Sequence, residues 1–238
     1  MPTLGIIGTG NIGAAVARLA VAAGIPVVVA NSRGPESLTG LIAELGSLAT
    51  AGTVEQAAQA GDLILLSVPL TAHTAIPADL LNDKVVLDTS NYYPHRDGRI
   101  AELDQDKITT SELIHRHFPQ ARLVKAFNNI LAHHIPQLAR PVDAPDRTAL
   151  PIAGDDADAK TAAAALIHQL GYDTVDAGTL AQSWRIEPET TAYTRLYLAD
   201  PATPGEQMMQ APASPVPAAE LRRALEAAER VHVADRVF

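Results

Sequence analysis

The fold of this chain is decided by the stretch Thr3-Leu4-Gly5-Ile6-Ile7-Gly8-Thr9-Gly10-Asn11-Ile12-Gly13. The apolar run that ends at Ile7 predicts a strand, and the alanine-rich residues from Asn11 to Ala23 predict a helix. Between them, the pattern Gly-x-Gly-x-x-Gly permits a tight turn, close approach of the backbone to a pyrophosphate, and close packing of the helix on the strand. An ordinary turn without a ligand is the alternative, but a preceding strand and a following helix are the context that a dinucleotide site requires. The residues predicted to hold the pyrophosphate at the helix N-terminus are Gly8, Thr9, Gly10, Asn11 and Ile12.

The end of the second predicted strand, Ile25–Ala30, indicates which dinucleotide binds. An acidic residue at this position normally accepts a hydrogen bond from the ribose 2′-hydroxyl of NAD. Here the sequence is Asn31-Ser32-Arg33-Gly34, and no carboxylate follows until Glu36. The planar guanidinium of Arg33 suits a 2′-phosphate, and Asn31 and Ser32 add neutral hydrogen bonds. Unless Arg33 is only a solvated loop residue, the sequence predicts NADP as the cofactor.

The rest of the chain alternates short β-branched runs with alanine-rich helical stretches, which is typical of a parallel sheet with crossover helices. The further predicted strands are Leu63–Val68, Lys84–Asp88, Leu123–Phe127, Ala149–Ala153 and Tyr172–Asp176, and the further predicted helices are Thr53–Ala60, Ser111–Phe118, Asp156–Leu170 and Ala218–Asp235. Thr109 and Glu112 have the spacing of a capping box at the start of one of these helices. The irregular, proline-containing segment 137–147 predicts a domain boundary. We therefore expect an α/β fold with a Rossmann-type doubly wound parallel sheet, divided into a dinucleotide-binding domain over 1–146 and a smaller C-terminal α/β domain over 147–238.

Two polar segments follow neighbouring strands of the expected sheet. Ser67-Val68-Pro69-Leu70 follows one strand, and Thr89-Ser90-Asn91-Tyr92-Tyr93-Pro94 follows the next. Either segment alone is explained as a turn that a proline ends. Together they lie just beyond the carboxyl ends of strands, where doubly wound sheets bind their ligands. The sequence therefore predicts that Ser67, Val68, Pro69 and Asn91 contact the nicotinamide half of the cofactor.

Composition narrows the class of protein. Of the 238 residues, 47% are hydrophobic and 19% charged, so a sizeable core is expected. The net charge of −9 argues against nucleic acid and anionic membranes as partners, because both attract cationic proteins. The sequence contains no cysteine, which excludes disulfides, thiolate metal sites and a cysteine nucleophile. No basic signal-like segment opens the sequence, and the longest apolar stretch, Ala14–Ala30, is interrupted by Arg18, so a cytoplasmic location is expected.

The motifs occur in the same order as in a known family. Beyond the two motifs above, they are Lys125-Ala126-Phe127-Asn128, Pro151-Ile152-Ala153-Gly154-Asp155-Asp156, Asp176-Ala177-Gly178-Thr179-Leu180 and Glu187-Pro188. This order resembles the NADPH-dependent reductases of coenzyme F420, as far as Pro188. The module is also similar to the soluble half of membrane metalloreductases, in which a flavin accepts the hydride. The tail from Thr190 onward has no counterpart in the resemblance.

The resemblance implies direct hydride exchange between NADP and a deazaflavin or flavin, without a metal and with no side chain as the catalytic group. It implies a homodimer in which the smaller C-terminal domain closes as a lid over the nicotinamide. By the same resemblance, Val68, Pro69 and Asn91 would border the nicotinamide, Ala126 would belong to the cofactor site, and Phe127 and Asn128 would border the second ring. The partner is then a small-molecule hydride acceptor.

Several interpretations stay open beside this one. A reductase of small carbonyl or imine compounds would use Lys125 as a proton donor, whereas a structural lysine would pack its stem at the strand end. A non-enzymatic NADP sensor would need no catalytic group. The pairs His115/His117 and His133/His134 lack a convergent third ligand, so solvated helix histidines are preferred to a metal site. Trp184 and Arg185 are candidates for the lid.

Overall fold

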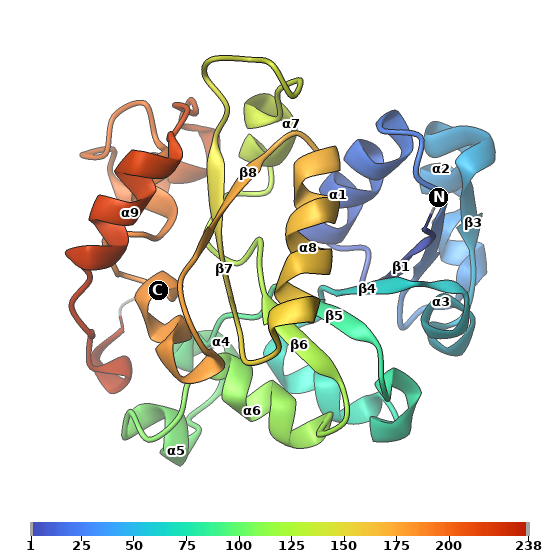
Figure 1. Ribbon diagram of the computed structural model, residues 1–238. Helices are drawn as coiled ribbons and strands as arrows, with labels where there is room; N and C mark the ends of the chain where they lie inside the picture. The colour runs from blue at the N-terminus through green and yellow to red at the C-terminus, as the bar shows by residue number, and fades with distance from the viewer. Residues whose placement is uncertain (1, 237–238) are drawn as a thin grey trace.

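The structure is a computed structural model that describes residues 2–236, and within them eight strands form one sheet (Figure 1). The strands are β1 (Leu4–Ile7), β2 (Val27–Ala30), β3 (Ala49–Ala51), β4 (Leu63–Leu66), β5 (Val85–Asp88), β6 (Arg122–Lys125), β7 (Ala149–Gly154) and β8 (Asp173–Asp176). The α-helices are α1 (Asn11–Ala22), α2 (Thr39–Leu45), α3 (Val54–Ala60), α4 (Pro94–Asp97), α5 (Ala101–Asp104), α6 (Thr110–His117), α7 (His134–Leu138), α8 (Ala157–Gln169) and α9 (Ala218–Glu226). Short 3-10 helices are η1 (Pro35–Leu38), η2 (Gly46–Leu48), η3 (Leu70–Ala75), η4 (Ala78–Leu81), η5 (Leu180–Ile186), η6 (Thr194–Tyr197), η7 (Gly205–Gln210) and η8 (Val233–Asp235).

The strand order is β3-β2-β1-β4-β5-β6-β7-β8. β1 lies between β2 and β4 and runs parallel to both, with Ile7 opposite Ala30 and Leu66. After β3 the chain therefore crosses to the other side of β1, and this reversal is the switch point at which such sheets bind ligands. β7 is antiparallel to β6, and β8 is parallel to β7. The predicted Rossmann-type α/β fold is confirmed.

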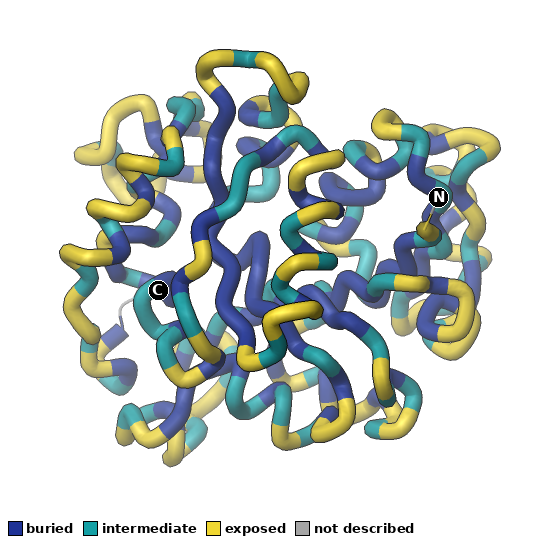
Figure 2. The backbone as a smooth tube through the Cα atoms, in the orientation of Figure 1, coloured by how far each residue is buried: buried dark blue, intermediate teal, exposed yellow. Residues whose placement is uncertain are grey.

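Helices cover both faces of the sheet. Successive strand residues point to opposite faces, so Leu65 packs in the core that contains α1 and α8, whereas Leu66 packs in the core that contains α3 and α6. Figure 2 shows most of the central strands as buried segments between exposed helix surfaces. Burial on both faces explains why the strand Val27–Ala30 is apolar throughout rather than alternating.

Two parts of the chain fold as the sequence predicts. Thr109 accepts a hydrogen bond at Oγ1 from the backbone N–H of Glu112 (3.2 Å), and its own N–H donates to Oε2 of Glu112 (2.7 Å). This capping box begins α6 at the predicted place. The predicted β-α-β unit near the C-terminus is also confirmed as β7, α8 and β8.

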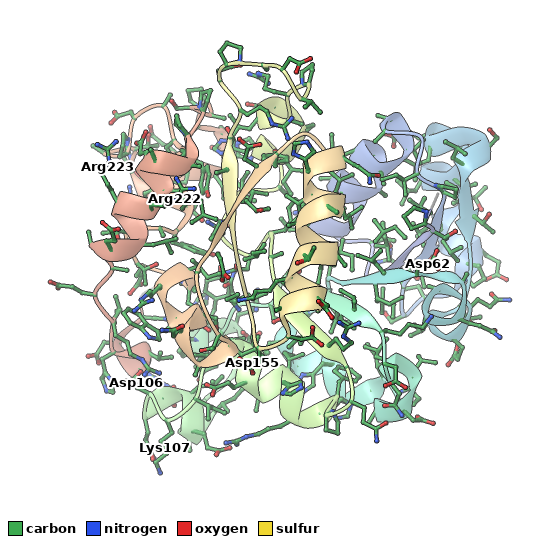
Figure 3. The ribbon with its side chains drawn as sticks, in the orientation of Figure 1. Asp62, Asp106, Lys107, Asp155, Arg222 and Arg223 are labelled. Carbon is green, nitrogen blue, oxygen red and sulfur yellow. The ribbon has the colours of Figure 1, made fainter. Side chains whose placement is uncertain are left out.

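Several predicted elements are too long, and the strands expected over Ile25–Ala30 and Leu63–Val68 span only Val27–Ala30 and Leu63–Leu66. The strand expected to reach Phe127 ends at Lys125, because Phe127 has a φ of 57°, which no strand residue adopts. The helix expected over Ala218–Asp235 ends at Glu226. Beyond it the chain turns back to Asp106, whose carboxylate accepts hydrogen bonds from His232 and from the N–H of Val233 (3.1 Å). Figure 3 labels Asp106 near the segment that follows α9.

The sheet continues across the predicted domain boundary. Residues 137–147 contain the end of α7 and a turn, and β7 then hydrogen-bonds to β6. The division into 1–146 and 147–238 remains a prediction, and residues 1, 237 and 238 lie outside the described part.

Candidate functional site

A cleft of about 490 Å³ opens at the carboxyl ends of β1, β2 and β4. We call it the cofactor cleft. Its lining residues are Ile7, Gly8, Thr9, Gly10, Asn31, Ser32, Arg33, Val54, Ser67, Val68, Pro69, Ala72, Ala75 and Ile76. Three segments predicted from the sequence meet here, namely the glycine turn, the end of β2 and the end of β4. The cleft therefore lies at the switch point of the sheet.

The glycine turn is shaped by close contacts that only glycine allows. Gly8 has a φ of 100°, and a Cβ there would lie 2.1 Å from the carbonyl oxygen of Ser67. A Cβ on Gly13 would lie 2.0 Å from the carbonyl oxygen of Gly8. Gly10 differs, because a Cβ on it meets no atom of the described chain within 4 Å. Because Gly10 also lines the cofactor cleft, its backbone is open to a ligand there.

The N-terminus of α1 is available to an anion. Gly10 is its N-cap, and no side chain in the described part of the protein caps this end. The N–H groups of the first turn, at Asn11 and Ile12, then lack intrahelical partners, and they carry the positive end of the helix dipole. Asn11 and Ile12 do not line the cleft. Their contribution to the site is this backbone, which suits a pyrophosphate.

The loop after β2 holds Arg33 at the cleft. Asn31 accepts a hydrogen bond at Oδ1 from the N–H of Arg33 (2.8 Å) and donates through Nδ2 to Oγ of Ser37 (2.9 Å). Ser37 donates in turn to the carbonyl of Gly34 (2.7 Å). Between residues 2 and 236, no carboxylate forms an ion pair with Arg33. Its guanidinium therefore has a free charge to offer a phosphate.

Asn91 and Asn128 form an amide pair instead of lining the cleft, with Asn128 buried and Asn91 partly buried. Asn128 donates through Nδ2 to Oδ1 of Asn91 (3.1 Å), and Asn91 donates through Nδ2 to the carbonyl of Asn128 (2.7 Å). Asn91 also donates to the hydroxyl of Tyr193 (3.1 Å), and Asn128 donates to the carbonyl of Ile186 (2.6 Å). The amide N–H groups of both residues are thus already engaged. They connect the end of β5 to the chain after β8.

A second and larger cavity, of about 680 Å³, lies beside this amide pair. Tyr93 and Tyr193 both line it, and their hydroxyls hydrogen-bond to each other. Burial, together with the nearby hydroxyl of Tyr93, raises the pKa of Tyr193 well above its ordinary value, so its proton is retained. We call this space the tyrosine cavity. Its lining residues are Tyr93, His95, Arg96, Leu131, Glu189, Thr190, Tyr193, Thr194, Arg195, Gly205, Met208 and Met209.

Ala126 and Phe127 line neither space. Both are fully buried, and the ring of Phe127 packs edge-on against Tyr172 with centroids 6.3 Å apart. Their contribution is a turn with positive φ at Phe127, which follows β6 and leads to Asn128.

Lys125 ends inside the protein. Its side chain has no solvent exposure, and Nζ donates to the carbonyl of Ser90 (2.8 Å) and to Oγ of Ser111 (3.1 Å). The carboxylates of Asp88 and Glu187 lie 4.0 and 3.9 Å away. The structure therefore favours the packed lysine over a proton donor that meets substrate.

Glu187 joins this buried group to the end of the chain. Its Oε2 accepts from Nη2 of Arg236 (3.0 Å), and its Oε1 accepts from the N–H of Thr110 (2.8 Å). Burial alone would raise the pKa of the carboxyl, but the charges of Lys125 and Arg236 outweigh it and hold the pKa below its ordinary value. The sequence contained one weak signal for this network, the Glu187-Pro188 pair. It contained no signal for Arg236 or Tyr193.

Of the four histidines expected to be solvated, His134 is instead buried. His134 is fully buried and Nε2 donates to the carbonyl of Ala211 (2.9 Å), while His73 is buried against the carbonyl of Leu70. In the described residues, no three acidic, histidine or cysteine side chains converge on a point that would hold a metal ion.

No helix within residues 2–236 combines the length and apolar character needed to cross a membrane.

Protonation of His134 is expected to destabilise the fold in mild acid. Burial, with a smaller contribution from the nearby His133, holds its pKa below the ordinary value. As pH falls through about 6.5, the unfolded chain binds the proton before the folded chain does, so the free energy of unfolding decreases. We expect the decrease between pH 7.5 and 5.5, measured by urea unfolding, to shrink in His134→Gln. An equal decrease in both proteins would contradict this assignment.

Sequence comparison identifies relatives of this chain. A family described as "NADP oxidoreductase coenzyme F420-dependent" matches residues 3–92. The metalloreductase STEAP3 of Rattus norvegicus is 31% identical over 188 residues, which are 78% of this chain but 36% of the relative. The chain thus spans only about a third of the length of that curated relative.

Solved structures share the fold. A hypothetical protein of Sinorhizobium meliloti is 34% identical, with a TM-score of 0.66 over 77% of this chain and 88% of its own. A candidate F420-dependent NADP reductase of Arthrobacter has 24% identity and a TM-score of 0.64, over 77% of this chain and 87% of its own. The second likeness concerns the fold alone.

Proposed function

Because the chain belongs to the family of coenzyme F420-dependent NADP oxidoreductases, we propose that it transfers a hydride between NADP(H) and a deazaflavin or flavin acceptor. The observation that carries the proposal is the cofactor cleft, which is lined by Gly10, the N-cap of α1, and by Arg33, which forms no ion pair within residues 2–236. These groups fit the pyrophosphate and 2′-phosphate of NADP. When bound, NADPH supplies the hydride.

The proposal assigns the acceptor to the tyrosine cavity. Its wall includes Tyr193, which is bonded to Asn91 just after β5, and β5 adjoins β4, whose end lines the cofactor cleft. Direct hydride transfer between two rings needs proximity, orientation and exclusion of water rather than an acid–base pair. Aromatic and methionine side chains in a cavity of this volume suit a planar ring.

A second candidate is reduction of a small carbonyl or imine compound. Such a reaction needs a proton donor, and the candidates are the hydroxyls of Tyr93 and Tyr193, two residues that line the tyrosine cavity. Lys125, the donor considered first, is shut off from both spaces. The homodimer expected from the family resemblance remains a prediction.

One spectroscopic assay separates these functions. The protein is mixed with NADPH and, in separate samples, a deazaflavin, FMN and a panel of small carbonyl compounds, and the absorbance of the reduced nicotinamide is followed. We expect rapid loss with the deazaflavin or FMN. Loss only with a carbonyl compound would replace the proposal by the second candidate, and NADPH binding without any turnover would favour a sensor.

Arg33→Ala is expected to weaken NADPH binding by about 10- to 100-fold, since a charge-assisted hydrogen bond contributes about 1.5–3 kcal/mol. Affinity for NADH, which lacks the 2′-phosphate, should stay unchanged. The measurement is a titration of nicotinamide fluorescence. Arg18→Ala is the control, because Arg18 pairs with Glu44 and does not line the cleft. An unaltered preference for NADPH in Arg33→Ala would refute the 2′-phosphate assignment.

A further inference from the structure

Two buried cations hold the peptide carbonyls on both sides of Asn91. Lys125 Nζ donates to the carbonyl of Ser90 (2.8 Å), and Arg236 Nη1 donates to the carbonyl of Tyr92 (3.1 Å). The two cations come from distant parts of the sequence, one from the end of β6 and the other from the residue after η8. The backbone of Asn91 is therefore held through the peptide carbonyls of both neighbouring residues.

A third cation holds Asn91 itself. Arg96 donates through Nη2 to the carbonyl of Asn91 (3.1 Å), while its guanidinium pairs with the carboxylate of Asp97 at 2.8 Å. Three consecutive carbonyls after β5 thus each accept a hydrogen bond from a different cationic side chain. Charged donors make stronger and shorter hydrogen bonds than neutral ones, so this segment has little freedom.

Glu187 balances the two buried cations together. One carboxylate oxygen lies 3.9 Å from Lys125 Nζ and the other 3.0 Å from Arg236 Nη2. A buried ion pair often contributes no more stability than apolar residues of the same volume would. What this network adds is a defined position for the carbonyls that Lys125 and Arg236 hold.

Asn91 in turn contacts a residue that lines the tyrosine cavity. The amide of Asn91 donates to the carbonyl of Asn128 (2.7 Å) and to the hydroxyl of Tyr193 (3.1 Å). With both N–H groups engaged, this amide acts as a link between the strand end and Tyr193. Tyr193 is the residue of the cavity lining that this chain of contacts reaches.

We propose that Glu187, Lys125 and Arg236 form a buried clamp that fixes Asn91 and, through it, the Tyr193 hydroxyl that orients the hydride acceptor. The inference rests on the proposed function, since the acceptor is assigned to the tyrosine cavity. Tyr193 contacts the acceptor, whereas Glu187, Lys125, Arg236 and Asn91 are positioning residues. A misplaced acceptor would react slowly although NADPH binds normally.

The test is a double-mutant cycle between Glu187→Gln and Tyr193→Phe. Each single variant is expected to lower kcat/KM for the acceptor by about 10-fold or more, with the NADPH dissociation constant within about twofold of wild type. Since both changes act through the same hydroxyl, the double variant should be no slower than the worse single variant. Additive losses would overturn the clamp, because a general structural weakening has no reason to depend on Tyr193.

Two further variants keep the result interpretable. If Glu187→Gln does not fold, Arg236→Lys replaces it in the cycle, because this change retains the charge. Arg99→Gln is the matched control, because Arg99 holds the same tail through the carbonyl of Ala234 (2.9 Å) without touching the clamp. It should keep nearly wild-type turnover, and a loss equal to that of Glu187→Gln would mean that tail docking alone matters.

Amide hydrogen exchange separates the clamp from the proposed function. In Glu187→Gln, the amides of residues 89–93 are expected to exchange faster than in wild type and in Arg99→Gln. If wild type oxidises NADPH with none of the acceptors, the proposed function fails while this exchange result still decides the clamp. Unchanged exchange in that segment would overturn the clamp whatever the activity.

Discussion

Gly10→Ala is expected to fold normally but to bind NADPH about 100-fold more weakly. This corresponds to a loss of about 3 kcal/mol in the free energy of binding. A Cβ at this position meets no described atom within 4 Å, and the residue has a φ of −72° that alanine readily adopts. The methyl group would instead occupy the space through which the pyrophosphate approaches the backbone. The expected effect is therefore on the ligand and not on the fold.

The matched comparison is Gly8→Ala. There a Cβ would lie 2.1 Å from the carbonyl oxygen of Ser67, and the φ of 100° strains any side chain. This variant should lose thermal stability as well as NADPH binding. Gly40→Ala is the control, since a Cβ there also meets no described atom and Gly40 lies on α2. Melting temperature and nicotinamide fluorescence measure the two effects, and normal NADPH affinity in Gly10→Ala would contradict the phosphate site.

The cofactor cleft could be predicted because its determinants are local in sequence. Gly8, Gly10 and Arg33 each follow a strand that hydrophobic periodicity identifies, and the topology of a doubly wound sheet brings those strand ends together. The capping box at Thr109 is equally local and begins α6 correctly. Short local patterns therefore predicted the segments that line the cofactor cleft.

The tyrosine cavity and the clamp could not be predicted in this way. Tyr193 meets Asn91 across 102 positions of sequence, and Arg236 meets Glu187 across 49. Neither contact follows from periodicity or from a cap, because both depend on how the tail packs. The helix predicted as far as Asp235 failed for the same reason: contacts with Asp106 outweigh the helical pattern beyond Glu226.

Phe127 illustrates a different difficulty. It was expected beside the second ring, on the basis of the family resemblance. In the structure the positive φ turns its ring into the core against Tyr172, and the neighbouring Asn128 makes the contacts that reach Asn91. A motif identifies a segment but does not say which of its side chains faces a ligand.

Lys125→Met is expected to lower the free energy of unfolding by about 3–5 kcal/mol, the range for removing one partner of a buried ion network. The change leaves the fully buried Asp88 without a cationic partner in the described residues, although the N–H of Ser90 (2.9 Å) and the hydroxyl of Ser111 (2.5 Å) still donate to it. It also leaves Glu187 with Arg236 as its remaining charged partner there. It also removes the donor that holds the carbonyl of Ser90. Urea unfolding measures the loss.

Lys84→Met provides the control for that measurement. Lys84 precedes β5 and donates to the carbonyl of Gly61 (2.8 Å), but it forms no ion pair with a carboxylate in residues 2–236, so its replacement should cost about 1 kcal/mol or less. The double variant Lys125→Met/Glu187→Gln should lose less than the sum of the two single losses, because it removes opposite charges together. If Lys125→Met were instead as stable as wild type, the assignment of Lys125 to a buried ion network would be contradicted.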